Sequence, residues 1–238
     1  MARAGSLALA SAFALTLGTA ACGSSQSSPD HTTPHPPTAA GPAPGTTPAP
    51  SALSESDLKA RLLTAADLPA GFTPDATATE ANGHITTADT HCQPLATLMN
   101  SDGAPPGATA TAEASFTRSE LGPDIATGLA AFPAVEPAQN LLNTVSAATK
   151  SCTTLTETDK DGTSYDFAVA PLNFPPTGDA ATATRMSADI GGYPAQVDIV
   201  LTRIGSTLLY VADTGLGDAD VGLTEDVVQR AVAKVRAA

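Results

Sequence analysis

The stretch AQVDIVLTRIGSTLLYVADT, residues 195–214, predicts two long antiparallel strands joined by a tight turn. Both halves are rich in β-branched and aliphatic residues, and Gly205-Ser206 supplies the turn between them. An isolated hairpin is only marginally stable in water, so this one needs further strands and a helical layer. We therefore expect residues 197–203 and 207–213 to form a rigid platform within a larger sheet.

Other segments show the patterns of the strands that this platform needs. Polar and apolar residues alternate over 110–117, which is typical of a half-buried strand. Lys160-Asp161-Gly162 has the composition of a hairpin turn. Six or so antiparallel strands are predicted in all, at residues 110–117, 124–132, 153–159, 163–172, 180–190 and in the hairpin.

Helical patterns occur at both ends and in the middle of the same region. Ser54 to Asp57 resembles a capping box, and a short helix is expected from about His91 to Met99. A longer helix should begin near Pro137, and the last helix should take Thr224 as its N-cap. The fold class expected is α+β, an antiparallel twisted sheet packed against several helices in a two-layer sandwich.

The N-terminus has the anatomy of a secretory signal peptide over residues 1–21. Arg3 precedes an apolar run at 7–17, and small residues follow it. The sequence LGTAAC, ending at Cys22, resembles a bacterial lipobox, although Thr19 stands where leucine is usual. A diacylglycerol on the Cys22 thiol would hold the protein at the extracytoplasmic face of the cell membrane. The alternative is an ordinary secreted protein with a free or paired Cys22.

Composition divides the rest of the chain into a tether and one domain. Residues 22–52 are rich in Pro, Ser and Thr, and predict a disordered tether that cannot bury a core. Residues 53–238 are long enough for a single domain. The chain has 24 acidic and 11 basic residues, a net charge of −13, which argues against nucleic acid as a partner.

Several segments together resemble the PknH-type extracellular sensor domain. They are RLLTAADLPAGF (61–72), a cysteine that opens a short helix, an Ala-rich strand, EPAQNLLNTV (136–145) with Cys152, VDIVLTRIGSTLLYVA (197–212) and a closing amphipathic helix. That domain forms the outer part of certain actinobacterial transmembrane Ser/Thr kinases and occurs in free-standing lipoproteins. The resemblance covers residues 55–236 and implies a sensor-like binding role in such a lipoprotein.

Cys92 and Cys152 are the two cysteines of the domain. An even pair outside the membrane is most simply a disulfide. The alternative is a redox or nucleophilic thiol, but the spacing is not that of a C-x-x-C motif. Family members of this type typically carry two disulfides and a tryptophan, whereas this chain has no Trp.

Candidate catalytic and metal-ligating groups are few. His84 and His91 are the only histidines of the domain, and no G-x-S-x-G motif accompanies them. ETDKDG (157–162) resembles the start of a calcium loop, but Ala168 stands where the loop needs Glu. Asp218 and Asp220 are a second weak calcium candidate. We expect no catalytic residue, no metal site and no cofactor.

Three functional hypotheses follow from these observations. The first is a non-enzymatic domain that binds an unknown envelope ligand or protein, for which Asp198 and Arg203 are candidate contacts, although both also suit a solvated strand face. The second is a carrier of apolar lipid or glycolipid, which needs a hollow core. Small residues at Ala110, Ala112 and Ala114 are where a groove is expected. The third is a secreted hydrolase that uses His84 or His91.

Overall fold

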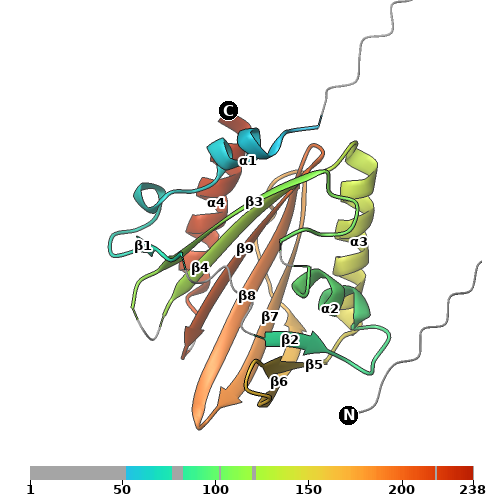
Figure 1. The fold of residues 1–238 in the computed structure, drawn as a ribbon, viewed down its shortest axis with the longest axis vertical. Coiled ribbons are helices and arrows are strands. Elements are labelled where there is room, and N and C mark those ends of the chain that lie inside the picture. The colour runs from blue at the N-terminus through green and yellow to red at the C-terminus, as the bar shows by residue number, and fades with distance from the viewer. Residues whose placement is uncertain (1–51, 77–82, 102, 120–121, 218, 238) are drawn as a thin grey trace, which may run out of the picture. The chain divides into compact units, whose positions relative to one another are not determined.

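The computed structural model describes residues 52–76, 83–101, 103–119, 122–217 and 219–237. These residues form one antiparallel sheet of nine strands with helices packed against it (Figure 1). The strand order is β1-β3-β4-β9-β8-β7-β6-β5-β2. The α+β class and the antiparallel sheet predicted from the sequence are thus confirmed.

The strands lengthen toward the centre of the sheet. Their bounds are β1 Thr73–Pro74, β2 Gly83–Thr86, β3 Ala110–Thr117, β4 Asp124–Ala131, β5 Thr154–Asp159, β6 Ser164–Pro171, β7 Ala180–Ile190, β8 Tyr193–Ile204 and β9 Thr207–Leu216. The helices are α1 Glu55–Arg61, α2 Gln93–Met99, α3 Val135–Ser151 and α4 Val221–Ala237, with a 3₁₀ turn at Ala65–Asp67.

The hairpin of β8 and β9 lies at the middle of the sheet, as the sequence predicted. The two strands stay paired from Ile204 opposite Thr207 to Ala195 opposite Leu216. β7 pairs with the other edge of β8 over its whole length, from Ala180 to Ile190. Gly191 and Gly192 both have positive φ and join these two strands, because a two-residue hairpin turn of this hand favours glycine.

Helices cover both faces of the sheet, which adds a third layer to the two-layer sandwich expected. Successive strand residues point to opposite faces. Val200 of β8 therefore packs in one core with Leu58 of α1 and Val227 of α4. Leu201, its neighbour, packs in the other core with Leu95 of α2 and Leu142 of α3. The platform of β8 and β9 is buried on both sides, which explains why aliphatic residues occur at both odd and even positions of these strands.

The helix boundaries were mostly predictable from capping residues, with one correction. Ser54 and Asp57 form the expected capping box of α1. α3 begins at Val135 and includes Pro137 in its first turn, where the missing N–H costs nothing. α4 begins at Val221, so Thr224 lies inside the helix and is not its N-cap. Thr224 is fully buried and its hydroxyl donates to Asp213 on β9.

Two short edge strands went unpredicted. β1 has two residues and pairs with β3, and β2 has four residues and pairs with β5. Strands this short contain too few residues to show an alternating pattern. Within the described residues, no helix is long and apolar enough to cross a membrane.

Candidate ligand-binding site

An apolar cavity of about 250 Å³ lies between the sheet and the layer formed by α2 and α3. We call it the apolar pocket. Its floor is the face of β7, β8 and β9 that carries Met186, Ile199 and Leu208, and its roof includes Leu98 of α2 and Val145 of α3. The full lining is Leu95, Leu98, Met99, Ser101, Gly103, Pro105, Ala130, Val145, Leu155, Thr182, Thr184, Met186, Val197, Ile199, Leu201, Leu208, Tyr210 and Ala212.

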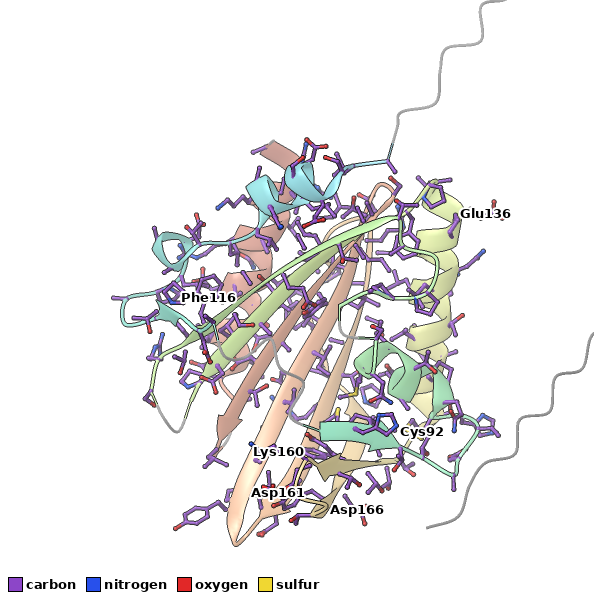
Figure 2. The ribbon with its side chains drawn as sticks, in the orientation of Figure 1. Cys92, Phe116, Glu136, Lys160, Asp161 and Asp166 are labelled. Atoms are coloured by element: carbon purple, nitrogen blue, oxygen red, sulfur yellow. A yellow bond between two sulfur atoms is a disulfide. The ribbon has the colours of Figure 1, made fainter. Side chains whose placement is uncertain are left out.

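The short helix α2 is held over the pocket from both of its ends. At its start, a disulfide joins Cys92 to Cys152, the residue that follows α3 (Figure 2 labels Cys92). At its end, the Asn100 side chain accepts from the Ile85 N–H at 2.9 Å and donates to the Ile85 carbonyl at 2.7 Å. A seven-residue helix is marginal by itself, so these two attachments position its pocket-lining residues.

One side of the pocket ends in a polar pair built across three strands. Tyr210 on β9 lies opposite Gly128 on β4, which lies opposite Glu113 on β3. A Cβ at Gly128 would clash with the tyrosine ring, so glycine allows Tyr210 to cross β4 and donate its hydroxyl to Glu113. Burial, reinforced by the carboxylate of Glu113, raises the pKa of Tyr210 above its usual range. Tyr210 is therefore a neutral donor at this wall.

Two other polar side chains of the pocket have hydrogen-bond partners within the domain. Thr184 on the floor shares a 2.7 Å hydrogen bond with Thr149 of α3, and both residues are buried. Ser101 donates to the Leu98 carbonyl at 2.6 Å. A ligand in the pocket would thus meet mainly aliphatic carbon, which favours an apolar ligand over a charged or sugar-like one.

The two histidines lie apart from this pocket. His84 is exposed on the edge strand β2, and His91 is exposed just before α2. Among the described residues, neither imidazole makes a hydrogen bond or ion pair with a carboxylate that could orient it as a general base. No observation in this part of the chain supports the hydrolase hypothesis.

Asp198 and Arg203, the candidate ligand contacts, both have charged partners within the domain, and the solvated strand face expected at Asp198 is wrong. Asp198 is fully buried on the α4 side of β8, where Arg185 binds it with two hydrogen bonds of 2.7 and 2.6 Å. Arg203 lies on the other face, donates to Gln139 of α3 and pairs with Asp179 at 3.2 Å. These partners could not be predicted, because the sequence does not show that helices cover both faces of the sheet.

The calcium candidates have plainer structural roles. Asp159 accepts from the backbone N–H of Asp161 and Thr163 and closes the β5–β6 hairpin, where Lys160 and Asp161 are labelled in Figure 2. Asp220 accepts from the Gly222 N–H at the start of α4, and Asp218 lies outside the described residues. In the described ranges, no three His, Cys, Asp or Glu side chains gather as a metal site.

The prediction of a groove at the Ala-rich strand is wrong about its position. Ala110, Ala112 and Ala114 face the core beneath α1, where small side chains let the helix approach β3 closely. The apolar pocket lies on the opposite face. The sequence signal that could have indicated it is Gly128, because a glycine inside a strand often marks the close approach of another group.

Asp213 is a buried carboxyl behind the platform, on the face that α4 covers. It is 1% exposed and accepts a hydrogen bond of 3.0 Å from Thr224. Burial raises its pKa to about 6, and the nearby negative charges of Asp198 and Asp220 add to the effect, whereas Thr224 and Arg118 oppose it. A carboxyl whose pKa is raised in the folded state stabilises that state at low pH.

We expect the stability contribution of Asp213 to fall as the pH rises from about 4 to about 7. Asp213→Asn removes the charge but keeps the shape. Its free energy of unfolding should therefore rise by about 2 kcal/mol relative to that of the wild type over that pH interval. Urea unfolding at several pH values measures the difference. Asp226→Asn, at a half-exposed carboxylate of α4 that pairs with Arg230, is the control. A difference between wild type and Asp213→Asn that does not change with pH would contradict the assignment.

Cys22 and the segments 1–21 and 22–51 lie outside the described residues. The signal peptide, the lipidation and the tether therefore stay predictions.

Comparison with known families gives one match over most of the chain. The family model for the PknH-like extracellular domain matches residues 53–234. No curated protein sequence matches the chain significantly.

Two solved structures match the chain. The crystal structure of the extracellular domain of PknH from Mycobacterium tuberculosis superposes with a TM-score of 0.62 at 16% identity, covering 79% of this chain and 99% of that chain. The X-ray structure of an uncharacterized protein from Mycobacterium smegmatis has a TM-score of 0.41 at 12% identity, covering 72% of this chain and 92% of that chain. The first likeness establishes that the two share a fold.

Proposed function

Since the chain belongs to the family of PknH-like extracellular domains, we propose that it is an extracytoplasmic, non-enzymatic binding protein whose ligand is apolar. The family supports a sensor-like role outside the cytoplasm. The ligand class comes from the pocket, because its lining is dominated by leucine, valine, isoleucine, methionine and alanine side chains.

The observation that supports the proposal most directly is the existence of the pocket itself. A core of this size is normally close-packed, with few voids larger than one water molecule. A cavity of about 250 Å³ beside the central strands therefore leaves dispersion contacts unmade that an apolar ligand would supply. Its volume is below the range of about 300–1,000 Å³ typical of pockets for drug-sized ligands, so the enclosed part of the ligand is small.

A thermal-shift comparison of apolar and polar compounds tests this function. Decanol and dodecane-type probes should raise the melting temperature, because a ligand that binds only the folded state stabilises it. Soluble sugars, wall peptides and amino acids should leave it unchanged. Stabilisation by the polar compounds alone would contradict the proposal of an apolar ligand.

Transport is a second candidate function, and the opening of the pocket favours it. Val197, Ile199 and Ala212 line the pocket and are only half-buried, so a ligand could enter and leave along the sheet without unfolding α2. A carrier of lipid or glycolipid should speed the transfer of a labelled lipid between two vesicle populations. A sensor would bind the lipid without speeding its transfer.

We further propose that residues 1–21 are removed and that Cys22 carries the lipid anchor. The tether of residues 22–52 would then connect the membrane to a single domain at 53–238, with two acyl chains sufficient for stable attachment. This arrangement would place the pocket near the outer face of the cell membrane, where apolar ligands are found.

Cys22→Ala should move the protein from the membrane fraction to the soluble fraction. Mass spectrometry of the wild-type N-terminal peptide should show the signal peptide missing and acyl mass on Cys22. A Cys22→Ala variant that stays anchored would refute the lipid attachment, and the binding function of the domain would be untouched by that result.

A further inference from the structure

The apolar face of the pocket floor continues beyond the helices that cover it. Only three large hydrophobic side chains are well exposed in the described part of the chain, namely Tyr193 at 66%, Val135 at 49% and Leu216 at 44%. Tyr193 begins β8 and Leu216 ends β9, so two of the three lie at one end of the central strands.

Strand alternation places these two residues on the same face as the pocket. Tyr193, Val197, Ile199 and Leu201 are separated by even numbers of residues along β8, and the last three line the pocket. Leu216 pairs with Ala195, which belongs to the same series. A stripe of apolar side chains therefore runs from Leu201 inside the pocket to Tyr193 at the tip.

We propose that the ligand is chain-like, a single acyl chain that enters the apolar pocket and lies along this stripe to Tyr193 and Leu216. The proposal rests on the apolar-ligand function proposed above and names the class of molecule. The enclosed cavity receives one end of the chain, and the open sheet face receives the rest.

The dimensions of the stripe favour a chain over a compact molecule or a protein. Eight residues separate Leu201 from Tyr193, a distance of about 26 Å along the strand. Three strands give a width of about 10 Å, and hence an area of about 260 Å². A standard protein interface buries about 800 Å² on each partner, so the stripe is too small to be one. One leaflet of a bilayer holds acyl chains of about 15 Å, which fit within its length.

A chain on this stripe also explains why aromatic and aliphatic side chains are exposed at the tip. Tyr193 follows the Gly191-Gly192 turn and leaves most of its side chain exposed. A chain that reaches the tip would cover Tyr193 and Leu216, whereas a chain too short to reach them would contact only the pocket.

Calorimetric titration with octanoate, dodecanoate and hexadecanoate, and with lysophospholipids of matching chains, tests the proposal. The wild type should bind with affinity that increases with chain length for both head groups. The double variant Tyr193→Ser/Leu216→Ser should bind hexadecanoate about tenfold more weakly and octanoate equally well, because only the long chain covers the tip. Val135→Ser, at the exposed start of α3 away from the stripe, should bind like the wild type.

Each other outcome has a distinct meaning. Equal affinity for all chain lengths, or hexadecanoate binding that the double variant leaves unchanged, would overturn the chain-like ligand while leaving an apolar ligand in the pocket intact. Binding by the lysophospholipids alone would assign the head group, and not the chain, as the recognised part. If neither the fatty acids nor the lysophospholipids bind while a compact apolar compound such as cyclohexanol stabilises the domain, the stripe is wrong and the pocket is not.

Discussion

Replacing Cys92 and Cys152 together by serine should lower the free energy of unfolding by about 4 kcal/mol. The disulfide closes a loop with a sequence separation of 60, and in the chain-entropy model a loop of this length restricts the unfolded chain by about that amount. Both cysteines are buried, so the serines would add unfavourable burial of two hydroxyls. Urea unfolding of the variant and the oxidised wild type measures the loss.

The same change should weaken ligand binding, because the bridge positions α2. Leu95, Leu98 and Met99 would no longer be fixed over the pocket. The wild type after reduction is the matched control and should lose a similar free energy. Two thiols that react with an alkylating agent in the native, unreduced protein would contradict the bridge.

Ala212→Phe should reduce affinity for apolar ligands by about a hundredfold. Ala212 lines the pocket from β9 and is half-buried, so a ring at this position can occupy the cavity without displacing a close-packed core. The ligand would then lose the burial of a group of similar size, which contributes about 3 kcal/mol. Competition with a bound fluorescent fatty acid measures the affinity.

The control for this variant is Ala168→Phe. Ala168 is an exposed strand residue of β6, next along the strand from Phe167, which packs in the core of α2 and α3. The alternation of side chains turns it to the other face of the sheet. The Ala168→Phe variant should bind apolar ligands like the wild type. Equal weakening by both variants would mean that the Phe acts through general destabilisation and not by filling the pocket.

The central hairpin and the helices around it could be predicted because their signals are local. The apolar runs of β8 and β9, the Gly205 turn and the capping box at Ser54 each act within a few residues. What could not be predicted is how many helical layers cover the sheet. That depends on whether the odd or even residues of a strand meet a helix. In β8 the odd set is mostly apolar, but the even set mixes Val200 with Asp198 and Thr202, so its burial could not be read from the sequence.

The pocket could not be predicted from the sequence, for a related reason. Its lining comes from α2, the loop that follows it, α3 and strands β4, β5, β7, β8 and β9. No pair of neighbouring residues distinguishes a lined cavity from a filled core. Asp198 was misjudged because its partner, Arg185, lies across the β7–β8 ladder. Only the register of β7 against β8 brings Arg185 and Asp198 together.

Methyl-detected NMR during titration with decanoate tests most directly whether the domain binds an apolar ligand in this pocket. The account predicts that methyl signals of Leu98, Met99 and Val145 shift and saturate together, whereas those of Leu58 and Val227, in the core beneath α1 and α4, stay in place. Shifts confined to Leu58 and Val227, or no saturable shift at all, would contradict it.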